Sequence, residues 1–353
     1  MLTASPKMVR RVAWTIVVGG VLFLGTLATI QTLEAAARKL EAPREVEVAA
    51  NRVLWNPEDR RETHTGEFEI MNALELTSDD PAFGGFSALA LAPDGASFLA
   101  LSDQGVWAQG RLTFDDKGRL TGMSDLRLSP VLDPDGNTLD TQNDWDSESL
   151  AILAPAADGS AFGLLAVGFE HDHRIWLYDF GKDGPNARAT PLAVDLPWER
   201  FEKNGGLESL VTLPAERLLA ITEDAPEGAD NPAAYLIDLS DNSFTSLEIA
   251  YDAPHGVTDA VRLVDGDLLI LERRFNPVAG VGMQMRRLAA ADIAPGATLD
   301  GETLIDVGNR YSIDNMEGIA VRETDQGTEL IVIADDNFNS LQRTMLLQMR
   351  LSD

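Results

Sequence analysis

The sequence contains no cysteine among its 353 residues. Disulfide bonds, thiolate catalysis and cysteine-based zinc sites are therefore excluded. Basic residues are also scarce, because 28 Lys and Arg stand against 57 Asp and Glu, which gives a net charge of −29. No stretch forms the basic stripe that a phosphate backbone requires, so nucleic acid is excluded as a partner.

Several signatures of catalytic sites are missing as well. The chain has no G-x-S-x-G nucleophile elbow, no G-x-x-x-x-G-K-[ST] phosphate loop and no H-E-x-x-H zinc motif. Hydrophobic residues make up 44% of the chain and charged residues 24%, which is typical of a folded globular protein and excludes wholesale disorder. The length suits one large domain or two ordinary ones.

One long uncharged run stands near the N-terminus, from Val12 to Ile30, and three basic residues precede it. Its length fits a single membrane span, and Ala35–Ala37 offers a signal-peptidase site. Residues 1–37 are therefore expected to be either a membrane anchor or a cleaved signal peptide. A buried core helix would need packing partners that such an isolated segment lacks.

Both alternatives export the rest of the chain, because the positive flank stays in the cytoplasm. We expect a periplasmic or extracytoplasmic protein, either secreted or tethered to the inner membrane by residues 12–30. Without residues 1–37 its net charge is −31. Residues 38–65 carry mixed charges and are expected to form a linker, and residues 66–353 the folded domain.

From Gly66 onward, short β-rich runs alternate with turn residues, and five segments align with one another. They are GGFSALAL, WDSESLAIL, GGLESLVTL, HGVTDAVRL and NMEGIAV, and a turn and a second apolar run come after each of them. Equivalent positions are separated by 61, 60, 50 and 59 residues. Strand pairs that repeat at such a period are typical of β-propeller blades.

The strand count predicts how the ring closes. The first four units each contain two further strand candidates, whereas the fifth contains only TMLLQMRL before the chain ends. The unassigned run Glu67–Leu76 can supply the missing strand, so that both termini close the ring. The sequence therefore predicts an all-β propeller of five four-stranded blades, with six blades as the alternative.

The same alignment predicts two rings of polar side chains around the channel. The inner strands contribute Ser87, Glu148, Glu208, Thr258 and Glu317. The ends of the second strands contribute Asp103, Glu170, Glu223, Glu272 and Asp335. These acids come directly after apolar strands or lie inside them, which is unlike a solvated surface. Carboxylates that converge in a confined channel do not all stay ionised without a cation.

Three solutions to this accumulation of charge are open. The first is a hard metal ion held by oxygen atoms, and calcium is favoured over magnesium because it accepts irregular sets of ligands. The expected metal ligands are Glu148, Glu208 and Glu317, with Glu223 and Asp335 next. The second is pairing with the arginines nearby in the sequence, which are Arg174, Arg273, Arg274 and Arg343. The third is that some carboxyl groups keep their protons.

Few residues qualify for acid–base chemistry. His255 opens the fourth unit near the channel mouth and is the better single candidate for a general acid or base. His171 and His173 either form a metal or acid–base cluster with Glu170 or lie in a polar loop. The acidic stretch Asp133–Glu148 is expected to be either a second calcium loop or a polar surface turn.

Arg273 and Arg274 form the most basic patch near the expected channel mouth. A guanidinium group among carboxylates is suited to hold an anionic oxygen of a substrate. Neutralisation of the acidic rings is the alternative role for both side chains.

A series of motifs between Phe83 and Leu351 resembles the bacterial phytase-like family, described by "esterase-like activity of phytase". In order, the motifs are GGFSALALAPDG, LALSDQG, DSESLAIL, NGGLESLV, LLILERRFNP, DNMEGIAV and IADDNFNSLQRTMLLQMRL. One departure is Gln104, which stands where the resemblance implies an arginine or lysine. If that base holds an anion in the family, anion binding on that side is weaker in this chain. The resemblance implies a β-propeller, secreted or membrane-tethered, with phosphoester or ester hydrolysis.

Together these observations predict an exported propeller that hydrolyses a small phosphoester, carboxylic ester or lactone with the help of calcium at the channel mouth. Its negative charge argues against phytate as the substrate unless calcium bridges the two. The alternative is a non-catalytic, calcium-stabilised envelope propeller that binds a ligand or a protein partner. A third hypothesis is a sugar-acting lactonase-type propeller, which would not need Arg273 and Arg274.

Overall fold

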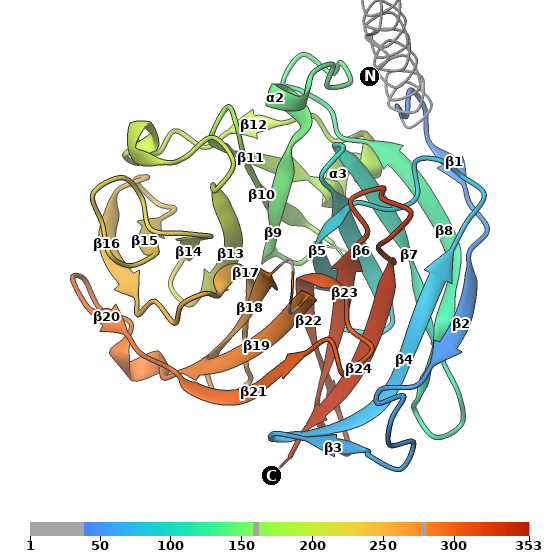
Figure 1. The fold of residues 1–353 in the computed structure, drawn as a ribbon. Coiled ribbons are helices and arrows are strands. Elements are labelled where there is room, and N and C mark those ends of the chain that lie inside the picture. The colour runs from blue at the N-terminus through green and yellow to red at the C-terminus, as the bar shows by residue number, and fades with distance from the viewer. Residues whose placement is uncertain (1–38, 158–161, 277, 279, 353) are drawn as a thin grey trace, which may run out of the picture. The chain divides into compact units, whose positions relative to one another are not determined.

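Five β-sheets make up almost all of the part of the chain that the structure, a computed structural model, describes (Figure 1). That part comprises residues 39–157, 162–276, 278 and 280–352. The segment expected to be a membrane anchor or signal peptide, residues 1–37, lies outside the described residues. Within those ranges, no helix combines the length and the apolar character needed to span a membrane.

Each sheet is a blade that corresponds to one of the predicted repeat units. The first contains β5 (Phe86–Leu91), β6 (Ser97–Ser102), β7 (Val106–Phe114) and β8 (Leu120–Pro130). The second contains β9 (Ser147–Ala154), β10 (Leu164–Phe169), β11 (Arg174–Asp179) and β12 (Thr190–Pro191). The third contains β13 (Leu207–Leu213), β14 (Arg217–Thr222), β15 (Ala233–Asp238) and β16 (Phe244–Ile249).

The last two blades have the same order from the inside outward. The fourth contains β17 (Gly256–Arg262), β18 (Leu268–Asn276), β19 (Gly280–Leu288) and β21 (Glu302–Gly308). The fifth contains β22 (Asn315–Thr324), β23 (Gly327–Asp335), β24 (Met345–Leu351) and β4 (Phe68–Thr77). The described helices are short: α2 (Gln142–Trp145), α3 (Phe180–Asp183) and three 3₁₀ turns.

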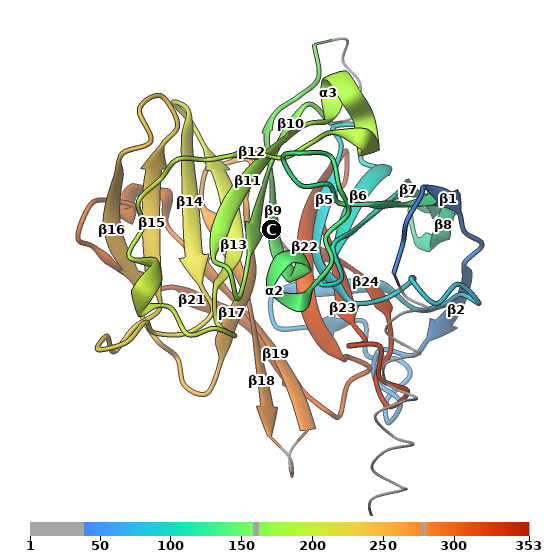
Figure 2. The same ribbon diagram turned by 90° about the horizontal axis from the view of Figure 1, so that it is seen from above.

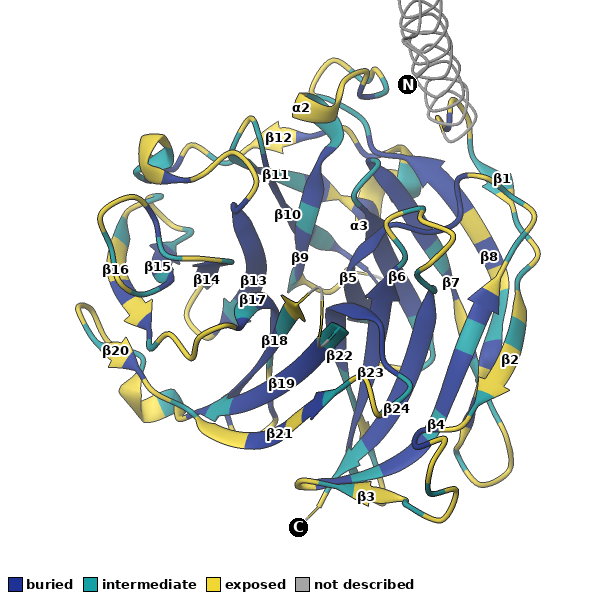
Figure 3. Cartoon of the chain, in the orientation of Figure 1, coloured by how far each residue is buried: buried dark blue, intermediate teal, exposed yellow. Residues whose placement is uncertain are grey.

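The five inner strands form a closed ring. Strand β5 packs on β9, β9 on β13, β13 on β17, β17 on β22, and β22 again on β5 (Figures 1 and 2). The inner and second strands of the blades are mostly buried, while exposed residues gather in the loops and outer strands (Figure 3). The prediction of a five-bladed propeller is therefore confirmed.

The ring closes through strands from both ends of the propeller. Strand β24 pairs with β23 on one side and with β4 on the other, with Leu347 opposite both Val332 and Ala73. Leu346 and Leu347 are fully buried there. The run Glu67–Leu76 thus supplies the missing strand of the last blade, as predicted, and covers the edge of β24 that would otherwise be unpaired.

The described part of the predicted linker, residues 39–65, belongs to the propeller and is not a linker. It contains β1 (Arg44–Glu45), β2 (Ala49–Val53) and β3 (His64–Thr65), which add to the outer edges of two blades. Leu40 and Trp55 are buried. The two-residue strands β1 and β3 are too short to show the alternating pattern that identifies a strand in a sequence, and AANRV in β2 does not alternate strictly.

Candidate functional site

Each inner strand carries a β-bulge at the same place. The register of its pairing shifts there and leaves one residue without a partner on the second strand. The five unpaired residues are Ser87, Glu148, Glu208, Thr258 and Glu317. These are the positions that the alignment matched, so their equivalence is structural. A bulge turns a side chain out of the regular alternation of the strand.

The members of this first ring divide into two kinds. The hydroxyl groups connect neighbouring blades, since Ser87 Oγ donates to the carbonyl oxygen of Ser147 (2.6 Å) and Thr258 Oγ1 to that of Met316 (3.1 Å). The three carboxylates instead line a cavity at one end of the channel. Only the acidic members of the ring are thus available to a ligand.

The second ring differs from the prediction in one blade. Backbone pairing places Asp103, Glu170, Glu223 and Asp335 opposite the residue two positions before each bulge, and in the fourth blade this place belongs to Arg273. Glu272 is therefore not a ring residue. Neighbouring residues of a strand point to opposite faces, so Glu272 turns away from the channel. Its carboxylate forms a buried ion pair with Arg286 (2.6 Å).

The cavity has a volume of about 810 Å³ and is strongly acidic. Its carboxylates belong to Asp103, Asp146, Glu148, Glu170, Glu208, Glu223, Asp314, Glu317 and Asp335. Among the described residues that line it, Arg273 is the single cationic side chain. Amide side chains, including Gln142 and Asn337, and a few apolar ones complete the lining.

An apolar layer underlies the carboxylates. Beyond the bulges the inner strands contribute Leu89, Leu150, Leu210, Ala260 and Ile319, all of them buried. These side chains line a separate, smaller hollow of about 240 Å³. The carboxylates therefore have apolar side chains on one side and other carboxylates around them. Both surroundings make the charged form of each group costly.

Burial and mutual repulsion raise the pKa of most of these groups. Burial raises the pKa of Glu148 and Glu208 well above the ordinary value, and neighbouring carboxylates raise it further. The same causes raise the pKa of Glu223 to about 7, even though Arg273 opposes the shift. For Glu317 the raised pKa is about 8. Without a cation the cavity therefore keeps protons at neutral pH.

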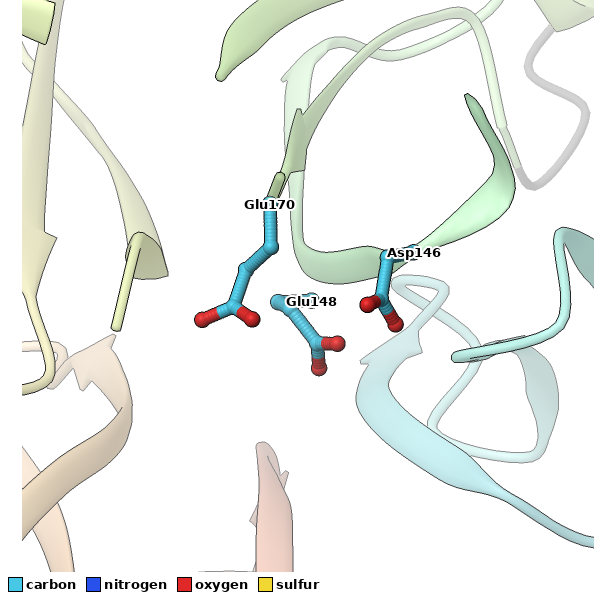
Figure 4. A group of neighbouring side chains, drawn as sticks. All are labelled: Asp146, Glu148 and Glu170. Carbon is cyan, nitrogen blue, oxygen red and sulfur yellow. The ribbon is translucent and has the colours of Figure 1, made fainter. Parts of the chain in front are cut away.

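Two groups of carboxylates come close enough to share one cation. Asp146, Glu148 and Glu170 each offer an oxygen within 4.8 Å of the others (Figure 4). Glu170, Glu208 and Glu223 do the same. Hard cations such as Ca²⁺ and Mg²⁺ take oxygen ligands of this kind, so the donor set fits such an ion.

Glu208 is the least satisfied member of these groups. Its residue is 7% exposed, it faces the cavity, and in the described part of the chain no hydrogen bond or ion pair reaches its carboxylate. A buried carboxylate without a partner is costly unless a cation or a proton compensates it. The Glu208 carboxylate is therefore stronger evidence for a bound ligand than the other carboxylates of the cavity.

Arginines neutralise only part of the cavity. Arg273 Nη2 donates to Glu223 Oε1 (3.0 Å), and its Nε lies 3.0 Å from Glu317 Oε1. Arg343 pairs with Asp314 (3.4 Å).

The two other arginines that were considered lie elsewhere. The guanidinium of Arg174 stacks on the rings of Phe169 and Trp176, and Arg274 pairs with Asp306. Neither lines the cavity. Gln104, which stands where the family resemblance predicted an arginine or lysine, donates a hydrogen bond to the neighbouring Asp103 carboxylate (3.2 Å).

The histidines lie outside the cavity lining. His255 is buried outside the cavity lining, where Arg274 Nη1 donates to its Nε2 (2.6 Å). This position does not support the acid–base role predicted for His255, nor the anion-binding role predicted for Arg274. His171 Nε2 lies 2.9 Å from Asp146 Oδ2, so it supports one cavity carboxylate, whereas His173 contacts the carbonyl oxygen of Glu202.

Asp146 is the main site residue that the sequence analysis did not single out. It stands two residues before Glu148, between α2 and β9, and each of the two carboxylates offers an oxygen within 4.8 Å of the other. The start of the acidic stretch that contains Asp146 forms an exposed turn, in which Asp133 accepts hydrogen bonds from Asn137.

One known protein family matches most of the chain. The family described as "Phytase-like: Esterase-like activity of phytase" has a sequence model that matches residues 81–338. No curated protein sequence matches the chain significantly.

Solved structures of low similarity include other β-propellers. The β-propeller domain of Myceliophteria thermophila Cps50 (Swd1) is 10% identical, with a TM-score of 0.40, and the match covers 86% of this chain and 100% of that one. Kuenenia stuttgartiensis hydrazine synthase is 15% identical, with a TM-score of 0.37 and coverage of 73% and 79%. Saccharomyces cerevisiae Sqt1 is 12% identical, with a TM-score of 0.36 and coverage of 81% and 82%.

Proposed function

This chain belongs to the phytase-like family, and we propose that its acidic cavity binds calcium and hydrolyses an ester bond there. The observation that carries the proposal is the excess of carboxylates over arginines in the cavity, together with the unpartnered Glu208. The substrate class is a small phosphoester, carboxylic ester or lactone. The net charge of −29 disfavours a highly anionic substrate.

The carboxylates of Asp146, Glu148 and Glu170 would hold the cation, and Glu208, which lies within 4.8 Å of Glu170 and of Glu223, would complete the set. They come from two neighbouring blades and are supported from behind. Gly206 N–H donates to Glu170 Oε1 (2.7 Å), and His171 lies against Asp146. The set is irregular, which suits calcium better than magnesium, since magnesium demands near-octahedral geometry.

A bound calcium ion would polarise the scissile group and lower the pKa of a water molecule beside it. The protein's own part is proton transfer and exclusion of bulk water. Glu223 and Asp335 line the cavity, and burial raises the pKa of each to about 7, so either carboxyl group can take up or release a proton near neutral pH. Amide side chains such as Asn204 and Asn337 are placed to orient polar groups of the substrate.

A non-catalytic scaffold is the second candidate, and one observation favours it. Among the described residues that line the cavity there is no histidine and no hydroxyl side chain. Covalent catalysis by the protein would lack a Ser, Thr or Tyr nucleophile there. In that case the calcium ion would be enclosed by protein oxygens and would stabilise the channel of a propeller that binds a ligand or a partner.

Calcium binding and hydrolysis, measured together on the full chain, distinguish these candidates. The melting temperature is monitored during a calcium titration after chelation, and hydrolysis of p-nitrophenyl phosphate, p-nitrophenyl acetate and a γ-lactone is assayed with and without calcium. Glu208→Gln removes a ligand, and Glu302→Gln on an exposed outer strand is the matched control.

Calcium-dependent hydrolysis that Glu208→Gln abolishes and Glu302→Gln leaves intact supports the hydrolase. A calcium-dependent rise in melting temperature without turnover of any ester favours the scaffold. If calcium changes neither the melting temperature nor the hydrolysis rate, both the catalytic and the structural calcium site are contradicted.

We also propose that the propeller acts outside the cytoplasm, on the strength of the sequence of residues 1–37 alone. Cell fractionation combined with N-terminal sequencing tests this location. A mature N-terminus near Arg38 indicates a cleaved signal peptide, and a full-length protein in the inner membrane indicates an anchor. Recovery of the full-length chain in the cytosol contradicts export.

A further inference from the structure

The charges of the cavity fall into two clusters that differ in how they are compensated. The open cluster comprises Asp146, Glu148 and Glu170, whose oxygens lie within 4.8 Å of one another, and Glu208, which comes equally close to Glu170 and to Glu223. In the described residues its contacts are with a backbone N–H, a glutamine side chain and His171, and no lysine or arginine pairs with it. The paired cluster comprises Glu223 and Glu317, which Arg273 joins through contacts of 3.0 Å each.

The paired cluster is built around the guanidinium group. Arg273 occupies in the fourth blade the place that a carboxylate occupies in the other four. Glycine at position 256 lets Glu223 approach, since a Cβ there would lie 3.1 Å from Glu223 Cγ. The carboxylates around Arg273, first of all Glu317, raise the pKa of its guanidinium, so the group is always charged.

We propose that Arg273 holds the place of a second cation, so that the cavity binds a single divalent ion at the open cluster. The inference rests on the proposed function, because it presumes that the open cluster binds an ion. The unpartnered, buried Glu208 is the independent sign that it does. An ion beside the paired cluster would be repelled by the guanidinium, which already contacts both carboxylates.

The two ion pairs of Arg273 also limit the charge of the substrate that the cavity can bind. Because Glu223 and Glu317 engage Arg273 from two sides, the guanidinium is not free to bind several negative charges. A neutral ester or lactone, or an ester with a single negative charge, is therefore the substrate class that suits this cavity.

The test is the number of calcium ions bound by the full-length chain, measured by elemental analysis after dialysis and by calorimetric titration. Arg273→Gln removes the fixed charge, and Arg273→Lys keeps it. Arg274→Gln is the matched control, since Arg274 pairs with Asp306 outside the cavity. We expect one ion in the unaltered chain, in Arg273→Lys and in Arg274→Gln, and two ions in Arg273→Gln.

Each other result overturns the inference in a distinguishable way. One ion in both the unaltered chain and Arg273→Gln means that Arg273 does not prevent a second ion from binding, while the proposed function stands. Two ions in the unaltered chain mean that the guanidinium does not replace an ion. No ion in either chain removes the cation site and the proposed function together.

A second comparison applies if Arg273→Gln does not fold, as judged by circular dichroism. Calcium affinity is then measured in Glu208→Gln and Glu317→Gln, one from each cluster. Loss of a ligand from the open cluster should weaken binding at least about tenfold, whereas loss from the paired cluster should weaken it less than about threefold. The reverse order would show that the ion binds beside Arg273.

Discussion

Glu272 and Arg273 are neighbours in β18, yet they belong to different parts of the protein. The guanidinium of Arg273 reaches Glu223 in the cavity at 3.0 Å, whereas the carboxylate of Glu272 turns outward to Arg286 at 2.6 Å. Both side chains of the outer pair are almost fully buried. The alternation of a single strand thus separates a charged site from a structural ion pair.

The outer pair should matter for stability and not for the cavity. Replacing Glu272 by Ala leaves Arg286 buried without its partner, and breaking a buried ion pair typically costs about 3–5 kcal/mol. We expect a lower free energy of unfolding in urea and unchanged calcium affinity. Weakened calcium binding in a folded Glu272→Ala variant would contradict this separation.

Glu208→Gln should act in opposite directions with and without calcium. In the chelated protein, the neutral amide removes a buried carboxylate whose pKa is raised by burial and by its neighbours, so the melting temperature should rise. The additional rise on calcium addition should shrink, because a ligand is missing. The check is a pair of melting curves at pH 8, and a decrease in the chelated protein would argue against an uncompensated carboxylate.

Stability without calcium should fall as the pH rises from about 5 to 8. Burial raises the pKa of Glu317 to about 8 and of Glu223 and Asp335 to about 7. In this window the folded state holds more protons than the unfolded state, so raising the pH favours unfolding.

Melting temperatures measured in chelator across that window test the sign of the effect. Saturating calcium should weaken the decrease, because the ion favours the ionised carboxylates. A melting temperature that stays constant or rises in chelator between pH 5 and 8 would show that the carboxylates are already compensated.

The closing strand should carry a large share of the stability. Leu347 in β24 is fully buried between β23 and β4, and a leucine-to-alanine change at such a position typically costs about 2–5 kcal/mol. Unfolding in urea measures the loss, with Leu341→Ala at an exposed loop position as the control. A loss no larger than that of the control would mean that the ring does not depend on this strand.

Much of this architecture could be predicted from the sequence, because the repeat is carried by apolar strands at regular spacing. The alignment placed Glu148, Glu208 and Glu317 at equivalent positions, and the structure confirms that all three line one cavity. The count of strands also identified the run Glu67–Leu76 as the closing strand. These predictions depend only on periodicity and on pairing every edge.

The predictions fail where a residue's position depends on the exact register of strand pairing. The fourth second strand was aligned one residue early, so Glu272 was assigned the place of Arg273, and a slip of one residue moves a side chain to the opposite face. His255 was predicted near the channel mouth, but its side chain is buried beside Arg274, outside the cavity lining. The bulges that orient the ring residues leave no mark in the sequence, because an extra residue in a strand has no characteristic composition.

The pairing of β4 with β24 also determines when the protein can fold. Strand β4 belongs to the first part of the propeller to be synthesised, and β24 to the last. The ring therefore stays open until the C-terminal strand has left the ribosome, and contacts between such distant segments form slowly. Until then the edge of β4 has no β24 partner, and an unpaired strand edge is prone to aggregation during synthesis.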